Sequence, residues 1–225
     1  MSKIHPSESK PWRGIPTAAA APGGTAACPS VWTVWKSSSM AFHGTDGFSV
    51  FDCNGKLAFR VDNYARRSKC AAGDVVLMDG EGRALLTLRP QIMSVHDQWN
   101  CLEGDGGSRQ NPTALVFSMR RRRFLQSSDE AEVFVGGAAA AAAGYRVEGS
   151  FRRRSCKILR RAGGTEQEVV VAEIRRKMAT SSVALGDDVF CLIVQPRAAD
   201  VKLLVAFIVV MDRICRRHRV PLLCS

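Results

Sequence analysis

A run of nine consecutive apolar residues near the C-terminus sets the strongest constraint on how this chain folds. The run extends over Leu203–Met211, within DVKLLVAFIVVMDRI. Asp200 precedes the run and Arg213 follows it. An acid near the N-terminus of a helix and a base near its C-terminus are both favourable, because each opposes the partial charge of that helix end. The pattern therefore predicts a helix over about residues 199–214.

The predicted helix is apolar on every side, so it must be buried. A membrane span needs about 20 apolar residues, whereas a run of about 10–14 is more typical of a helix in a protein core. Lys202 and Asp212 flank the run too closely for a span. We therefore expect a core helix, and the rest of the chain has to surround it.

Short strands separated by turns account for most of the remaining chain. In these runs β-branched and aromatic residues alternate with polar ones, and turn-forming residues separate the runs. The runs are VWTVWK, GFSVF, KLAFRV, DVVLMD, RALLTL, TALVFSMR, EVFVG, YRVEGSF, SCKILRR, EVVVAEIRR and DDVFCLIV. Closing the strands around the helix would cover its apolar surface and leave no exposed strand edge. We predict a mainly β fold, a closed antiparallel barrel around a central hydrophobic C-terminal helix.

Two stretches, FDCNGKLAFRV and MDGEGRALLTL, share one pattern in which Asp52 corresponds to Asp79 and Gly55 to Gly82. Each stretch is typical of a β-hairpin, and the Asn-Gly pair in the first favours a type I′ turn. The aspartates could be calcium ligands, but a calcium loop needs several oxygen ligands and each stretch supplies one or two acids. We favour a structural interpretation, in which an aspartate before a turn accepts hydrogen bonds from backbone N–H groups.

No catalytic or metal-binding set is recognisable in the sequence. His43, His96 and His218 are isolated from one another, and no GxSxG motif marks a nucleophile. The eight cysteines form no CxxC pair and no cluster with zinc spacing, which is typical of free thiols in a reducing compartment. We expect a non-enzymatic protein with no cofactor and no bound metal ion.

Basic residues exceed acidic ones, mainly in the last third of the chain. The formal net charge is +11, and residues 151–225 hold 15 Lys and Arg against 7 Asp and Glu. Such an excess favours an anionic partner, such as a membrane surface or a nucleic acid. Many of the arginines are consecutive. Because side chains alternate across a strand and an unpaired buried charge is costly, each group must lie mostly at a strand end, in a loop or on a sheet edge.

Four of these groups are candidate lipid- or anion-binding residues. They are Arg120, Arg121, Arg122 and Arg123; Arg152, Arg153 and Arg154; Arg160 and Arg161; and Arg175, Arg176 and Lys177. A further group, Arg216, Arg217 and Arg219, follows the predicted helix. Guanidinium groups match phosphate oxygens, so a barrel rim lined by them could hold a phosphorylated head group. In the alternative, the groups point in different directions and only protect strand edges from aggregation.

Four segments of the chain carry a resemblance to a known family. They are GFSVFDCNGKLAFRVDNY, VVLMDGEGRALLTL, SVHDQW and DVKLLVAFIVVMDRI. They resemble the plant LURP-one-related family over roughly Val31 to Arg217. That family is similar in fold to the tubby C-terminal domain and to phospholipid scramblases, which implies a closed barrel of about twelve strands around a central helix. The resemblance also implies a link to plant defence and, through tubby-like proteins, to phosphoinositide binding and membrane-tethered regulation of transcription.

Residues 1–30 are rich in Pro, Ala, Gly and Ser, and they are expected to form a disordered tail. A barrel domain is expected over residues 31–219 and a short tail over residues 220–225. The N-terminus shows no apolar signal segment, so we expect a cytoplasmic monomer that is peripheral at the plasma membrane or nuclear.

The function that we predict is binding of anionic, phosphoinositide-containing membrane surfaces. A nucleic-acid-associated transcription regulator is the alternative, although no recognition motif for DNA or RNA is present. A membrane-inserted scramblase is a second alternative, and it would require the apolar helix to leave the core.

Overall fold

In the residues that it describes, the computed structural model contains twelve strands and one helix. The described residues are 28–36, 47–62, 73–91, 97–105, 114–122, 129–136, 143–161, 167–196 and 200–217. The strands are β1 (Ser30–Lys36), β2 (Phe48–Phe51), β3 (Leu57–Asp62), β4 (Val75–Asp79), β5 (Ala84–Pro90), β6 (Trp99–Glu103), β7 (Leu115–Arg121), β8 (Ala131–Val135), β9 (Tyr145–Ser150), β10 (Ser155–Arg161), β11 (Glu168–Arg176) and β12 (Val189–Val194), and the helix is α1 (Val201–Arg217). Both predicted tails lie outside the described residues, apart from residues 28–30.

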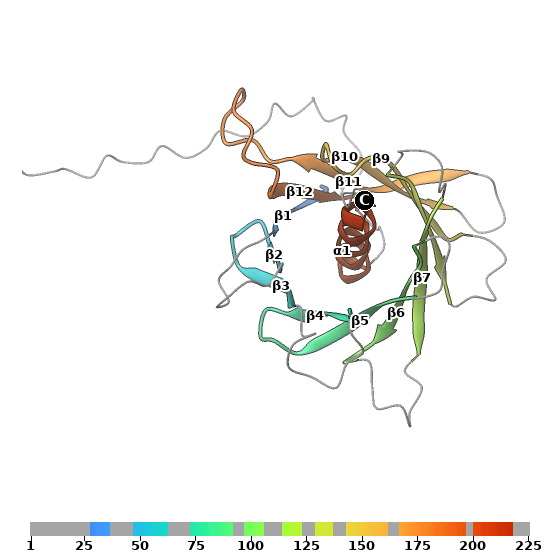
Figure 1. Ribbon diagram of the computed structural model, residues 1–225. Helices are drawn as coiled ribbons and strands as arrows, with labels where there is room; N and C mark the ends of the chain where they lie inside the picture. Colours follow the sequence, from blue (N-terminus) through green and yellow to red (C-terminus); the bar gives the residue numbers. More distant parts are fainter. Residues whose placement is uncertain are drawn as a thin grey trace, which may run out of the picture.

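The strands close into a barrel in which each strand is antiparallel to both of its neighbours. Consecutive strands pair from β1 to β12, and β1 also pairs with β12. Figure 1 shows α1 in the interior of the barrel, surrounded by the strands. The predicted mainly β, closed antiparallel barrel around a C-terminal helix is confirmed. Of the described strands, β6 alone lies outside the predicted runs, although its buried Trp99 and Cys101 alternate with less buried residues.

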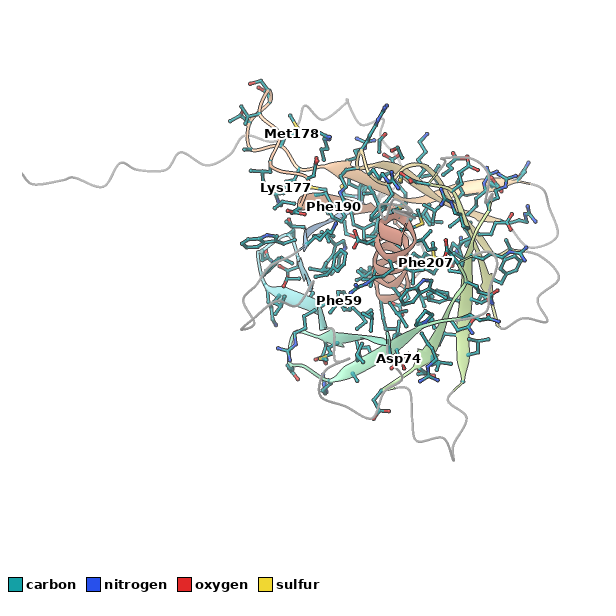
Figure 2. All side chains as sticks on the ribbon, in the orientation of Figure 1. Phe59, Asp74, Lys177, Met178, Phe190 and Phe207 are labelled. Atoms are coloured by element: carbon teal, nitrogen blue, oxygen red, sulfur yellow. The ribbon has the colours of Figure 1, made fainter. Side chains whose placement is uncertain are left out.

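Helix α1 fills the interior of the barrel. Each residue from Leu204 to Met211 is at most 1% exposed. Phe207, labelled on α1 in Figure 2, packs edge-on against Phe117 of β7, with the ring centroids 4.9 Å apart. Its ring also makes a tilted contact with that of Tyr145 of β9, at a centroid distance of 5.4 Å. The prediction of a core helix is confirmed. No helix in the described part of the chain is long and apolar enough to cross a membrane.

The paired aspartates organise two turns in the same way. Oδ1 of Asp52 accepts hydrogen bonds from the backbone N–H groups two and four residues later, at 2.9 and 2.8 Å. Oδ1 of Asp79 accepts the equivalent pair at 3.0 and 2.9 Å. These carboxylates hold the loop backbone, as expected for an aspartate that precedes a turn. The repeated pattern is therefore part of the barrel wall.

The turn type differs from the prediction. Gly55, with φ 77°, and Gly82, with φ 90°, occupy the left-handed region, whereas Asn54 does not. The N–H of Asp52 donates to the carbonyl of Lys56 at 3.0 Å, and the register of β2 against β3 shifts beside this loop. A type I′ turn needs positive φ at both central residues, so that prediction is wrong. The observed loops have three residues and end in a glycine that forms a bulge.

A pH titration checks the role of Asp79. Two hydrogen bonds from Arg83 hold the pKa of this carboxyl below its usual 3.8. The backbone N–H makes the larger contribution and the side chain the smaller one. A lowered pKa gives stability that is present above pH 3.8 and is lost as the pH falls through the folded-state pKa. We expect Asp79→Asn to unfold at lower urea concentration than wild type at neutral pH, and the difference to shrink in acid.

Two controls accompany that titration. Glu81→Gln, on the same turn, should leave the urea midpoint nearly unchanged, because the side chain of Glu81 is exposed and its ion pair with Arg83, at 3.3 Å, is exposed as well. Calcium should not raise the midpoint of wild type. A calcium-dependent rise that Asp79→Asn abolishes would restore the ligand interpretation.

Candidate anion-binding site at one end of the barrel

Three of the four predicted basic groups lie at the same end of the barrel. Alternate connections of an up-and-down barrel share an end. Arg120–Arg122 finish and follow β7, Arg152–Arg154 join β9 to β10, and Arg175–Lys177 finish and follow β11. Helix α1 follows β12 from the opposite end and finishes among these groups. Closure of the barrel thus brings together residues that are far apart in the sequence.

Other arginines of the predicted groups do not lie at this end of the barrel. Arg160 and Arg161 finish β10 at the opposite end of the barrel. Arg161 lies 4.0 Å from a carboxylate oxygen of Glu168, and Arg160 is exposed without an ion pair to a described residue. Arg123, Arg219 and the side chains of Arg216 and Arg217 lie outside what the structure describes.

The exposed arginines that surround the connections at the shared end form what we call the basic collar. They are Arg122, Arg152, Arg153 and Arg176. Nε of Arg176 donates to the carbonyl of Arg153 at 3.3 Å, which links β11 to the turn between β9 and β10. The side chains of Arg152 and Arg176 are 45% and 49% exposed, so both remain open to a ligand in solution.

Arg152 also closes the end of the helix. Its Nη2 donates to the carbonyl of Cys215 at 3.0 Å, and its Nε lies 3.8 Å from Oδ1 of the buried Asp129. Asp129 in turn accepts a hydrogen bond from the backbone N–H of Arg152 at 3.1 Å. A helix C-terminus carries unpaired carbonyls and partial negative charge, which this guanidinium stabilises. With this cap, α1 continues to Arg217, beyond its predicted end at residue 214.

Two predicted site residues are buried, so they cannot reach a membrane or any other large partner. Arg121 and Arg154 are each 5% exposed. Arg121 faces the interior together with Phe117 and Met119 of β7. Contrary to the prediction, Arg121 and Arg154 therefore do not belong to the binding surface. Arg121 is the last residue of β7, and the alternation of that strand turns its side chain inward.

Arg154 is held between two aromatic rings. Its guanidinium carbon lies 4.6 Å from the centroid of Phe151 and 4.2 Å from that of Phe190. Its Nε donates to the carbonyl of Asp187 at 3.0 Å. Burial lowers the pKa of Arg154, and nearby Asp212 opposes that shift. These contacts replace water around the buried charge, so Arg154 has a structural role at this end of the barrel.

Several of the exposed arginines already have acidic partners. Arg122 lies 3.4 Å from Glu130, and Arg176 lies 3.2 Å from Asp187. Arg153 is exposed and makes no ion pair with a described residue. Exposed ion pairs are weak, at about 0–1 kcal/mol, so a phosphate group can compete for these guanidinium groups.

Three candidates remain. The ammonium group of Lys177, which is half-buried, donates to Oγ1 of Thr33 on β1 at 2.6 Å. Arg120 and Arg175 lie on the outer wall. Arg120 contacts Glu132 at 3.4 Å and the ring of Phe134 at 4.5 Å, and Nε of Arg175 donates to Glu173 at 2.7 Å. Arg175 borders a hollow of about 450 Å³ on this wall. Its charged lining residues are Glu130, Glu148, Glu173, Lys157 and Arg175. Because acids outnumber bases there, we do not assign an anion to this hollow.

The thiols of Cys101 and Cys156 are deeply buried. Burial raises the pKa of Cys101 and of Cys156 to about 12, so both stay protonated at neutral pH. A buried, protonated thiol behaves as a small apolar side chain. Within the described ranges, no group of three His, Cys, Asp or Glu residues is arranged to hold a metal ion. His43, His96 and His218 lie outside the described residues.

A closed antiparallel barrel of twelve strands, filled by its own C-terminal helix, is the structural class that the fold defines. A solved X-ray structure of an Arabidopsis thaliana protein has the same fold, with a TM-score of 0.56 over 83% of this chain and 91% of that chain, at 21% identity. The model of the LURP-one-related family matches residues 30–212. The chain belongs to the LURP-one-related family.

Curated relatives in Arabidopsis thaliana agree with this assignment. LURP-one-related 5 is 38% identical over 80% of this chain and 80% of its own length. LURP-one-related 12 is 35% identical over 81% of this chain and 76% of its own length. LURP-one-related 8 is 35% identical over 83% of this chain and 87% of its own length. The predicted membership of this family is confirmed.

Proposed function

We propose that the protein is a non-catalytic module that binds anionic phospholipid membranes through the basic collar. The observation that carries this proposal is the convergence of three basic groups and the end of α1 at one end of the barrel. Arginine forks bind phosphate oxygens in pairs, so head groups with several phosphates, such as phosphoinositides, suit this surface best. Such binding would tether a regulator at the membrane, and the family resemblance suggests plant defence as its setting.

The expected contact is weak and depends on salt. Each Lys or Arg near an anionic surface contributes about 1 kcal/mol, and the attraction falls off within a Debye length of about 8 Å at physiological ionic strength. Arg153 contributes a charge that is not paired with a described residue, and Arg176 only has to exchange one exposed ion pair. Several such residues together are enough for reversible association.

Vesicle sedimentation across a salt series tests the proposal. Arg153→Gln combined with Arg176→Gln removes two collar charges, and we expect about 30-fold weaker binding to phosphoinositide vesicles. The matched control is Arg160→Gln combined with Arg161→Gln at the opposite end. It removes the same net charge, so its binding should stay close to that of wild type.

Two results would overturn the proposal. In the first, wild type fails to sediment with anionic vesicles even at low salt. In the second, both double variants lose the same affinity, which would show that net charge and not the collar drives binding. A gel shift with random-sequence duplex separates the alternative, since duplex binding without vesicle binding would favour a nucleic-acid-associated regulator.

A further inference from the structure

The connection between β11 and β12 projects from the collar end of the barrel. Figure 1 shows this segment, residues 177–188, extending away from the wall, and Figure 2 places Lys177 at its base. The segment folds back on itself, because Ala179 N–H donates to the carbonyl of Val183 and Leu185 N–H to that of Lys177, each at 2.8 Å. We call it the projecting hairpin. Every residue from 178 to 188 is exposed.

Large apolar side chains are concentrated on and beside the projecting hairpin. Met178 is 47% exposed, Val183 54% and Leu185 37%. Trp35, which is 41% exposed, lies opposite Val189, where the hairpin rejoins the wall. These four are among the seven large apolar residues that are exposed in the described part of the chain. Single exposed apolar residues are normal, but a group on one projection is typical of an interaction site.

The charged residues of the hairpin lie at its base, and its tip has none. Residues 178–186, MATSSVALG, contain no charged side chain. Arg176 and Lys177 lie just before this tip. Asp187 and Asp188 lie just after it. The carboxylate of Asp187 is 3.2 Å from Arg176, and Asp188 acts on the buried Arg154. Two basic and two acidic residues therefore flank the uncharged tip, which projects beside the basic collar.

We infer that the tip of the projecting hairpin enters the apolar boundary of the same anionic membrane whose head groups contact the basic collar. This inference rests on the proposed function. Removing Val183 and Leu185 from water is favourable. The internal backbone hydrogen bonds lower the cost of taking the tip out of water. Arg176 at the base, which is exposed, can remain at the level of the phosphates, as basic residues do at a membrane surface.

Neutral substitutions at the tip test the inference without changing the net charge. Val183→Ser combined with Leu185→Ser should bind phosphatidylserine vesicles about tenfold more weakly than wild type. The dependence of binding on salt should stay the same, because no basic residue is lost. The control is Val169→Ser, which removes an equally exposed valine, 54% in both cases, at the opposite end of β11.

A second readout locates the tip directly. Val183→Trp should be quenched by brominated phospholipids in bound vesicles, whereas Val169→Trp should show no quenching beyond that of the native tryptophans. Equal quenching of both variants would contradict insertion of the tip.

The outcomes separate this inference from the proposed function. In one outcome, Val183→Ser combined with Leu185→Ser binds vesicles as well as wild type does, while the collar variant loses binding. This result would overturn insertion of the tip but preserve the proposed function, and the hairpin would then be a candidate site for a protein partner. Failure of wild type to bind vesicles at all would overturn both. A loss in both the tip variant and the collar variant, with the two controls unaffected, would support both.

Discussion

Replacing Phe207 by alanine is expected to lower the free energy of unfolding by about 3–5 kcal/mol. The ring is fully buried in α1 and packs against Phe117 and Tyr145 of the barrel wall. Its removal leaves a cavity in the middle of the barrel. Because the surrounding strands are held in place by hydrogen bonds on both sides, they cannot move inward to fill it. Urea unfolding followed by tryptophan fluorescence measures the loss.

Val169→Ala is the control for that measurement. Val169 is 54% exposed on β11, so its truncation should change the free energy of unfolding by no more than about 0.5 kcal/mol. If Phe207→Ala lost less than about 1 kcal/mol, the helix would not be the packed centre of the molecule in solution.

Asp212→Ala is the second substitution with a large expected effect. Oδ1 of Asp212 lies 2.8 Å from Nζ of Lys36, and the two side chains are only 3% and 17% exposed. Removing the carboxylate leaves the Lys36 ammonium group poorly solvated and also withdraws a negative charge from the buried Arg154. Breaking a buried ion pair in this way costs about 3–5 kcal/mol, which urea unfolding at neutral pH would detect.

A double-mutant cycle shows whether that loss arises from the pair itself. Lys36→Met combined with Asp212→Ala should be less destabilised than the sum of the two single variants, because neither charge of the pair then stays buried without its partner. Strictly additive losses would contradict the coupling and would assign the effect of Asp212→Ala to lost packing.

The fold could be predicted because its main signals are local. The run Leu203–Met211 is apolar on every side and must be covered, and the alternating strands are the elements that can cover it. Strand β6 was missed because its sequence, WNCLE, has no β-branched residue and two polar ones, so it lacks the signal that marks the other strands. The turn at Asn54 was predicted wrongly because an Asn-Gly pair suits more than one loop. The hydrogen bond of Asp52 to Lys56 fixes the three-residue form.

The site could be predicted only in part. The placement of the groups mostly at strand ends followed from alternation and the cost of a buried charge, but Arg121, a predicted binding residue, is turned inward by the alternation of β7. The buried position of Arg154 has no comparable signal, because it follows from a turn in which this residue adopts φ 54°. The contact between Lys36 and Asp212 depends on closure of the whole barrel, which no linear pattern encodes. The hairpin at 177–188 was missed, although an uncharged MATSSVALG after RRK was visible in the sequence.

The order of the elements determines when this protein can complete its fold during synthesis. The wall closes only when β12 pairs with β1, and α1, which fills the interior, follows β12. While the ribosome is still making the chain, the inner faces of the earlier strands have no helix to cover them. Folding must therefore wait until β12 and α1 have been synthesised, and the unfinished wall is the species most exposed to aggregation. A premature stop before Val201 would leave a wall with no core.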